Sequence, residues 1–290
     1  MQFKSVLNYL WKLPICGIAF SVGLMLGSIV ATGMGLPTPV LPAGAEQATL
    51  AQYALLGSLL LALTLVSVSR GLSGGFVSRW LILSFLTWVA YGVNTYLEAA
   101  IFTTVSAASP FTVVMYFSAS LLCGAAVAWL FPPETKGGDF FANVQAFFAR
   151  RSAGAWAWRL LAAFLAFPLA YLAFGRLIAP FVTDYYRQQM SQLTLPGWDR
   201  ILPVLFLRSL FFLLACLPVL IAWQKSNRRL FVTLGVALFM LVGGLNMLGA
   251  YWLPPVLRVL HSLEMFADEV VYAGALVVLL VKNAAQSEVA

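Results

Sequence analysis

Long apolar stretches recur along the whole chain, and they constrain its fold more than any other feature of the sequence. A helix of about 20 apolar residues is long enough to cross the roughly 30 Å hydrocarbon core of a bilayer. We predict about eight membrane-spanning helices, near residues 13–35, 51–69, 80–104, 111–131, 159–182, 201–223, 230–253 and 256–281. Proline and glycine clusters separate them. Pro254 and Pro255 leave one alternative open, a longer kinked hairpin in place of the last boundary.

Composition supports an all-α polytopic membrane protein. The chain is 62% hydrophobic and 9% charged, and its mean hydropathy is +0.91, which lies far outside the range of soluble proteins. The net charge of +7 would suggest nucleic-acid binding in a soluble domain. Here the basic residues lie in short loops between apolar stretches, where they set topology. We therefore expect the lipid bilayer, and no nucleic acid, as a partner.

The basic residues are distributed unequally between the two sets of loops. One set holds most of them: Lys4, Lys12, Arg70, Arg79, Lys136, Arg150, Arg151, Arg159, Lys225, Arg228, Arg229 and Lys282. The positive-inside rule then places both termini in the cytoplasm, and we expect a bacterial inner-membrane protein. Residues 43–45, Ala-Gly-Ala, could instead mark a signal-peptide cleavage site. The apolar stretch before them is too long for an ordinary signal peptide, which favours a retained first helix.

A weak internal repeat divides the chain into two halves. Trp11-Lys12-Leu13 opens the first span and Trp158-Arg159-Leu160 opens the fifth, 147 residues later; Asn94 and Asn246 are 152 residues apart. We expect two parallel four-helix repeats, 1–135 and 158–290, unless the matches arose by chance. Residues 136–157 would be a cytoplasmic linker. Its Phe-rich face beside Arg150 and Arg151 is typical of a helix that lies in the membrane interface, with a partner-binding helix as the alternative.

The last span carries an unusual density of ionisable side chains. At about 100° per residue, Arg258, His261, Glu264, Asp268, Glu269 and Tyr272 fall within an arc of roughly 140°. A charge at bilayer depth costs about 2.5–3.5 kcal/mol on insertion scales, so this face should point inward and find partners. The alternative is a helix whose first turns lie in water.

Other spans supply polar residues at a similar depth. Tyr91, Asn94 and Glu98 follow helical spacing in the third span, and we expect Glu98 to pair with Arg208 or Arg258. Arg176 would lie in the outer part of the fifth span. The candidate site for substrate or proton is therefore a polar cavity in the outer half of the bilayer, lined by Asn94, Glu98, Arg208, Arg258, His261, Glu264 and Asp268. The alternative for any one pair is a salt bridge that only locks two helices.

Two further patterns carry less weight. Tyr185 and Tyr186 end the fifth span and are typical of an interfacial aromatic belt, although they could also cover the mouth of the cavity. Gly23 and Gly27 form a GxxxG in the first span, which permits close helix packing. In a chain with 22 glycines, such a match is weak evidence.

Several chemistries are disfavoured by the residues present. One histidine excludes histidine-rich zinc or di-iron sites, and no HExxH, GxSxG or Walker A pattern occurs in a suitable context. A metal site from His261, Glu264 and Glu98 is the alternative, but we predict none. The three cysteines lie in apolar stretches, as buried hydrophobic residues do. No residue pattern names a cofactor or an oligomeric state.

The remaining function classes differ in what the buried charges do. Our leading hypothesis is a proton-coupled transporter of a small solute, with His261 and the acids carrying protons. The second is a membrane-embedded enzyme for a lipid or isoprenoid, with His261 as general acid and base and arginines that hold an anionic head group. The third is a non-catalytic assembly or sensory subunit in which the charges lock helices together.

Overall fold

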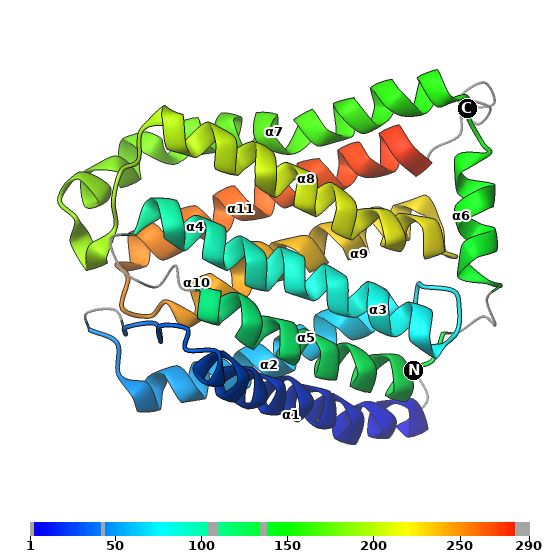
Figure 1. The fold of residues 1–290 in the computed structure, drawn as a ribbon, viewed down its shortest axis with the longest axis horizontal. Helices are drawn as coiled ribbons and strands as arrows, with labels where there is room; N and C mark the ends of the chain where they lie inside the picture. Colours follow the sequence, from blue (N-terminus) through cyan, green and yellow to red (C-terminus); the bar gives the residue numbers. More distant parts are fainter. Residues whose placement is uncertain (1–2, 42–43, 104–109, 134–137, 282–290) are drawn as a thin grey trace.

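A computed structural model describes residues 3–41, 44–103, 110–133 and 138–281. Their long helices run alongside one another in a bundle (Figure 1). The first half of the chain contains α1 (Phe3–Gly33), α2 (Gln47–Ser69), α3 (Phe76–Thr87), η1 (Trp88–Val93), α4 (Asn94–Phe102) and α5 (Pro110–Leu130). The short helix α6 (Phe140–Phe148) follows. The second half contains α7 (Ala153–Arg187), η2 (Met190–Gln192), α8 (Trp198–Ala222), α9 (Asn227–Phe239), η3 (Met240–Gly244), α10 (Leu245–Gly249), α11 (Pro255–Leu276) and η4 (Val277–Val281).

The prediction of an all-α polytopic membrane protein is confirmed. In the described part of the chain, seven helices are long and apolar enough to cross a membrane. The eighth predicted span forms the continuous helix α11–η4, which has the length but carries Arg258, Glu264, Asp268 and Glu269, so composition alone does not mark it as a span. A turn over residues 250–254 separates α10 from α11, with Pro255 at the first helical position. The two prolines therefore end one helix and begin the next.

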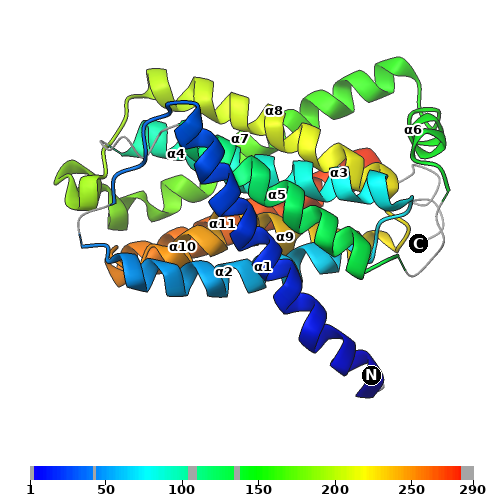
Figure 2. The ribbon, with the colours of Figure 1, turned by 60° about the horizontal axis from the view of Figure 1, so that its bottom comes forward.

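Two glycines allow α1 to approach α5 very closely. A Cβ atom at Gly23 would lie 2.4 Å from the Cα of Ala119, and one at Gly27 would lie 2.6 Å from the Cα of Met115. Carbon atoms in contact are normally about 3.5–4.0 Å apart. Figure 2 shows α1 crossing over α5 at this contact. The GxxxG of the first span is thus a helix-packing motif, although in a chain with so many glycines its pattern alone was weak evidence.

π-helical turns interrupt two of the spans. The third span is α3–η1–α4 and the seventh is α9–η3–α10, with the π turns at Trp88–Val93 and Met240–Gly244. A π turn holds more residues than an α turn, so side chains before and after it no longer share an α-helical face. This explains why the expected alignment of Tyr91 with Asn94 and Glu98 is wrong. Tyr91 instead packs on Phe20 of α1 and Tyr116 of α5.

Lys12 and Arg159 lie at one end of the bundle, together with most of the other basic side chains of the set predicted above, and we call this end the basic end. Lys12 donates to the carbonyl oxygen of Leu130 at 2.9 Å, and Arg159 donates to that of Leu279 at 2.5 Å. Each basic side chain thus satisfies a carbonyl near the C-terminal end of a helix, where acceptors lack intrahelical partners. Two other predicted members of this set, Lys136 and Lys282, lie outside the described residues, and only the backbone of Lys4 is described.

Helix α6 lies across the basic end, between α5 and α7 in the chain (Figure 1). The Asp139 side chain accepts a hydrogen bond from the Phe141 amide and caps the helix. Phe147 is buried against Trp156, with ring centroids 5.0 Å apart, whereas Phe141 is 72% exposed. The predicted amphipathic helix is therefore present, and its position in the membrane interface stays a prediction.

Two loops meet at the basic end and exchange backbone hydrogen bonds. Leu72 and Trp223 form an isolated antiparallel bridge. The Ser73 amide donates to the Ala222 carbonyl at 2.8 Å, and the Gln224 amide donates to the Gly71 carbonyl at 2.9 Å. Position 73 therefore pairs with 222 and position 71 with 224, on either side of the antiparallel bridge between 72 and 223. The loop between α2 and α3 thus pairs with the loop between α8 and α9.

Candidate functional site

A buried arginine links the two halves of the chain. Arg208 of α8 is 3% exposed. Its Nε donates to Oδ1 of Asn94 at 2.8 Å, and its terminal nitrogen lies 2.6 Å from Oε1 of Glu98. Asn94 and Glu98 are one turn apart on α4, so both point toward the same guanidinium group. The sequence left two partners open for Glu98, and the structure selects Arg208.

Aromatic rings enclose the rest of the guanidinium group. Its central carbon lies 5.2 Å from the ring centroids of Phe167 and Tyr171 and 5.8 Å from that of Phe212. Cation–π contacts at such distances are favourable and become stronger when water is excluded. The charge of Arg208 is therefore held between one carboxylate and a water-excluding aromatic wall.

Ser209, the neighbour of Arg208, fixes α8 against α7. Pro168 interrupts α7 and removes the amide that would bond the carbonyl of Phe164. The Ser209 hydroxyl donates to this carbonyl. Because Ser209 is fully buried, this contact both satisfies the free acceptor and sets the position of the adjacent arginine.

The polar face of α11 points inward, as its periodicity predicts. Glu264, Asp268, Glu269 and Tyr272 are buried. The opposite face is exposed, with Val259 57%, Leu263 59%, Phe266 45% and Val271 47% exposed. The acids of α11 are therefore surrounded by protein, which disfavours the alternative of a helix with an ordinary solvated polar face.

His261 joins α11 to the end of α7. Its Nδ1 lies 2.8 Å from Oε2 of Glu264, and its Nε2 lies 2.9 Å from the hydroxyl of Tyr186. Gly175 of α7 makes room for this arrangement, since a Cβ atom there would lie 3.1 Å from the other carboxylate oxygen of Glu264. Tyr186, His261 and Glu264 thus form a hydrogen-bonded chain, and Tyr186 does more than anchor a helix in the interface.

Five buried polar atoms around this cluster have no hydrogen-bond partner among the described residues. They are Oδ1 of Asp268, both carboxyl oxygens of Glu269, the hydroxyl of Tyr272 and Nδ2 of Asn94. Asp268 and Glu269 are only 2% and 1% exposed. An unsatisfied buried polar group typically costs about 1–3 kcal/mol, and more when it is charged. The carboxyl oxygens of Asp268 and Glu269 can therefore accept a proton, a cation or a hydrogen bond from a ligand, whereas Nδ2 of Asn94 can only donate.

Exposure increases along the cluster toward the end of the bundle opposite the basic end. Glu269, Asp268 and Arg208 are 1–3% exposed, whereas the side chains of Glu264, His261 and Glu98 reach 9%, 18% and 29%. The most exposed members of the cluster are therefore Glu98 and His261.

The charges of the cluster do not balance. The sequence suggested four acids facing three arginines, but only Arg208 contacts an acid of the cluster in the described part of the chain. Arg258 donates to the carbonyls of Met247 and Leu248 at the end of α10, and Arg176 is exposed on α7. Four carboxyl groups, of Glu98, Glu264, Asp268 and Glu269, therefore accompany one arginine.

Of the predicted site residues, Asn94, Glu98 and Arg208 form one hydrogen-bonded group, and His261 with Glu264 forms a second. Asp268 interacts electrostatically with Arg208 and with Glu264, which connects the two groups. Asn246 bonds Thr95 at 3.2 Å and belongs to neither. Within the described residues, no group of three or more His, Cys, Asp or Glu side chains could hold a metal ion.

Sequence reasoning missed the aromatic wall around Arg208, and it missed Ser209, which fixes α8 against α7. Phe167 and Tyr171 are one turn apart on α7, and Phe212 is one turn after Arg208 on α8. Nothing in an apolar span distinguishes these rings from lipid-facing aromatics. Ser209 was detectable in principle, because a proline in a span leaves a carbonyl that needs a donor from another helix.

Comparison with known proteins gives no relative for this chain: no family model, no curated protein and no solved structure matches it. The site must therefore be interpreted from its own geometry.

Proposed function

We propose that this integral membrane protein is a proton-coupled transporter of a small solute, with its binding site at the Arg208 cluster. One observation carries the proposal: unpartnered carboxyl oxygens of Asp268 and Glu269 are buried beside an arginine that bridges α8 and α4. Ionisable groups inside a membrane protein typically mark ion or substrate pathways.

The excess of carboxyl groups favours protons and a cationic or amine-bearing solute over an anion. An isolated buried carboxylate is very costly, and binding a proton or a cation removes that cost. The Glu264–His261–Tyr186 chain supplies three hydrogen-bonded groups along which a proton could be passed. It also connects the buried acids to the more exposed end of the cluster.

Arg208 has two sets of acidic partners available, Glu98 on α4 and the acids of α11. A change of partner could couple proton binding to a change in conformation. It now pairs with Glu98, while Asp268 and Glu269 interact with it electrostatically from α11. Protonation of Glu98 would weaken the present pair and favour an Arg208 contact with the acids of α11. The two arrangements of Arg208 would be two conformational states of the protein. A proton-driven conformational change requires two such states whose populations depend on protonation.

We also propose that residues 1–135 and 158–290 are related four-helix halves joined by the linker 136–157. Equivalent helices make equivalent contacts: α1 packs on α5 as α7 packs on α11, and α3 on α8 as α2 on α9. Lys12 and Arg159 cap corresponding helices, and the π turns begin at Trp88 and Met240, 152 residues apart. Relative rocking of such halves around a shared site is a common transport mechanism.

The distribution of basic residues supports an orientation with the basic end in the cytoplasm of a bacterial inner membrane, and hence both termini there. The Arg208 cluster would then lie in the outer half of the bilayer. Its more exposed members, Glu98 and His261, would face the external side.

Proteoliposomes test the transport proposal. Vesicles that contain the purified protein and an internal pH-sensitive dye would be given inward gradients of small amines, amino acids and short carboxylates in turn. We expect a proton signal with an amine-bearing solute, lost in an Asp268→Asn, Glu264→Gln variant. Asp184→Asn is the control. Asp184 is also an acid, but it is exposed and lies at the end of α7 outside the Arg208 cluster. Unchanged proton and solute flux in the Asp268→Asn, Glu264→Gln variant would refute the proposal.

The other function classes receive less support. A lipid-modifying enzyme would need arginines that converge on a head group, but Arg208 and Arg258 have separate partners. A purely structural role for the Arg208–Glu98 pair predicts a stability effect with no effect on flux. The proteoliposome measurement therefore distinguishes transport from the other two classes.

A further inference from the structure

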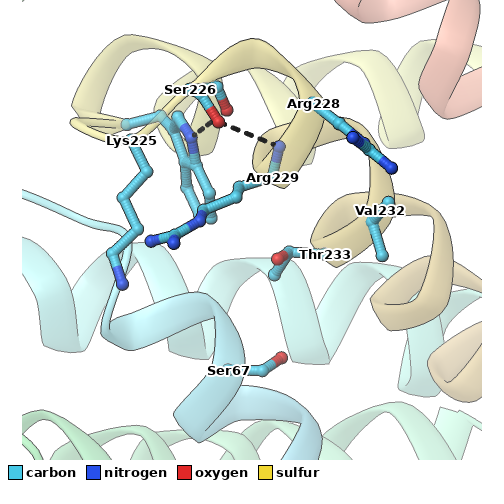
Figure 3. Close-up of a pocket in the computed structure, with 8 residues that line it drawn as sticks. Ser67, Lys225, Ser226, Arg228, Arg229, Val232 and Thr233 are labelled. Carbon is cyan, nitrogen blue, oxygen red and sulfur yellow. Dashed lines mark hydrogen bonds between the residues drawn. The ribbon is translucent and has the colours of Figure 1, made fainter.

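A basic cavity lies at the basic end of the bundle, and none of its lining residues belongs to the Arg208 cluster. It has a volume of about 530 Å³ and lies between α2, the loop after α8 and the start of α9 (Figure 3). Its lining comprises Ser67, Trp223, Lys225, Ser226, Arg228, Arg229, Val232 and Thr233. None of these lining residues is acidic. Three cations around one cavity, Lys225, Arg228 and Arg229, are suited to bind an anion.

The two sides of this cavity differ in how their cations are directed. Figure 3 shows the side chains of Lys225 and Arg229 extending toward the same side, to the left of Thr233 and above Ser67 in this view. Arg228 extends in the other direction. Lys225 and Arg229 are therefore placed to bind one anion together, whereas the adjacent Arg228 contributes charge from a different direction.

The local backbone is also arranged for an anion. Ser226 caps α9 through a hydrogen bond from the Arg229 amide, and the Trp223 indole donates to the Ser226 carbonyl at 3.4 Å. These contacts hold the loop so that the first turn of α9, with its partial positive charge, borders the cavity. The helix terminus adds to the field of the lysine and the arginine, and it is not needed to define the site.

The wall of the cavity continues into an apolar surface. Val232 is 53% exposed, Val236 one turn further along α9 is 45% exposed, and Leu63 one turn before Ser67 on α2 is 49% exposed. A free phosphate would not use this surface. A phospholipid would, because its acyl chains extend from the head group into the hydrocarbon.

We propose that this cavity binds the phosphate group of an anionic phospholipid, held between Lys225 and Arg229, with its acyl chains along α2 and α9. Basic pockets between membrane helices are recurrent sites for anionic lipid head groups. The site is separate from the Arg208 cluster, and it stands whether or not the protein is a transporter.

Native mass spectrometry of the purified full chain provides the test, with phosphatidylglycerol titrated in detergent and phosphatidylcholine as the neutral comparison. Charge-assisted hydrogen bonds are worth enough that Arg229→Gln and Lys225→Gln should each weaken phosphatidylglycerol binding about 10-fold or more. Arg228→Gln is the matched control, with the same charge at the neighbouring position. It should weaken binding no more than about 3-fold.

Each other outcome contradicts a stated part of the proposal. Equal losses in the Arg228 and Arg229 variants would mean a general attraction of charge and no defined site. Equal affinity for phosphatidylcholine would refute the preference for an anionic lipid. Displacement of phosphatidylglycerol by millimolar inorganic phosphate would refute a lipid ligand and identify a free-phosphate site. Circular dichroism of each variant confirms that the compared proteins are folded.

Discussion

Substituting Gly23 by alanine should destabilise the protein through one contact. The new Cβ atom would lie 2.4 Å from the Cα of Ala119 and 2.9 Å from its backbone nitrogen. Carbon atoms in contact are about 3.5–4.0 Å apart, so α1 and α5 would have to separate by about 1 Å. Overpacking of this kind costs about 1–3 kcal/mol, which exceeds the gain of about 0.5–1 kcal/mol when alanine replaces glycine in a helix.

Gly57 on α2 provides the matched control. No atom lies within 4 Å of a Cβ placed there, so Gly57→Ala should be neutral or slightly stabilising. Ala119→Gly should not rescue Gly23→Ala, because the clash is with the backbone of Ala119 and remains when its side chain is removed.

Thermal unfolding of the variants in the same detergent measures these differences. We expect a lower midpoint for Gly23→Ala and an unchanged or higher one for Gly57→Ala. Equal midpoints for the two variants would show that α1 and α5 do not approach as closely as this reasoning requires.

Three further predictions concern the polar core and the orientation. Arg208→Met should destabilise the protein by about 1–3 kcal/mol because it removes the donor to Asn94 and the cation paired with the partly exposed Glu98. Adding Glu98→Gln should partly restore stability in a double-mutant cycle, and additive effects would contradict the pairing. Ser209→Ala should cost about 1–3 kcal/mol by leaving a carbonyl of α7 unsatisfied, measured by thermal unfolding against wild type. With the basic end in the cytoplasm, a membrane-impermeant maleimide should label Gln188→Cys but not Gln224→Cys in intact spheroplasts. The three native cysteines are buried and should give no background. The reverse pattern would refute the orientation.

Most of the fold could be predicted from the sequence because the bilayer limits what an apolar chain can do. Every backbone polar group in hydrocarbon must be satisfied internally, so a stretch of about 20 apolar residues has to form a helix. The predicted spans agree with the observed helices at most boundaries. The largest difference is at the start of α1, which begins at Phe3 where the prediction began at 13. Helix α7 differs at both ends, since it extends over Ala153–Arg187, beyond the predicted 159–182. Polar and aromatic residues continue that helix past the apolar stretch used to predict it.

The polar site was predictable only in part. The periodicity of α11 indicated correctly which side of the helix points inward, since charges avoid lipid. The partners of each charge were not predictable, because they depend on how helices far apart in the chain are packed. Arg208 and Arg258 looked equally suitable for Glu98, but the turn after α10 directs Arg258 to backbone carbonyls. The π turn at Trp88–Val93 changed the alignment of Tyr91, and no sequence periodicity marks such a turn.

The sequence by itself therefore determined that this protein is a bundle of membrane helices with an inward-facing charged stripe, because hydropathy and helical period are local properties. The tertiary structure alone decided that one arginine serves both halves, that Asp268 and Glu269 lie buried with unpartnered oxygens, and that Gly23 and Gly27 face α5. These features depend on contacts between residues far apart in the chain, such as Gly23 with Ala119 and Arg208 with Glu98. Such contacts are set by the packing of whole helices, which local sequence does not encode.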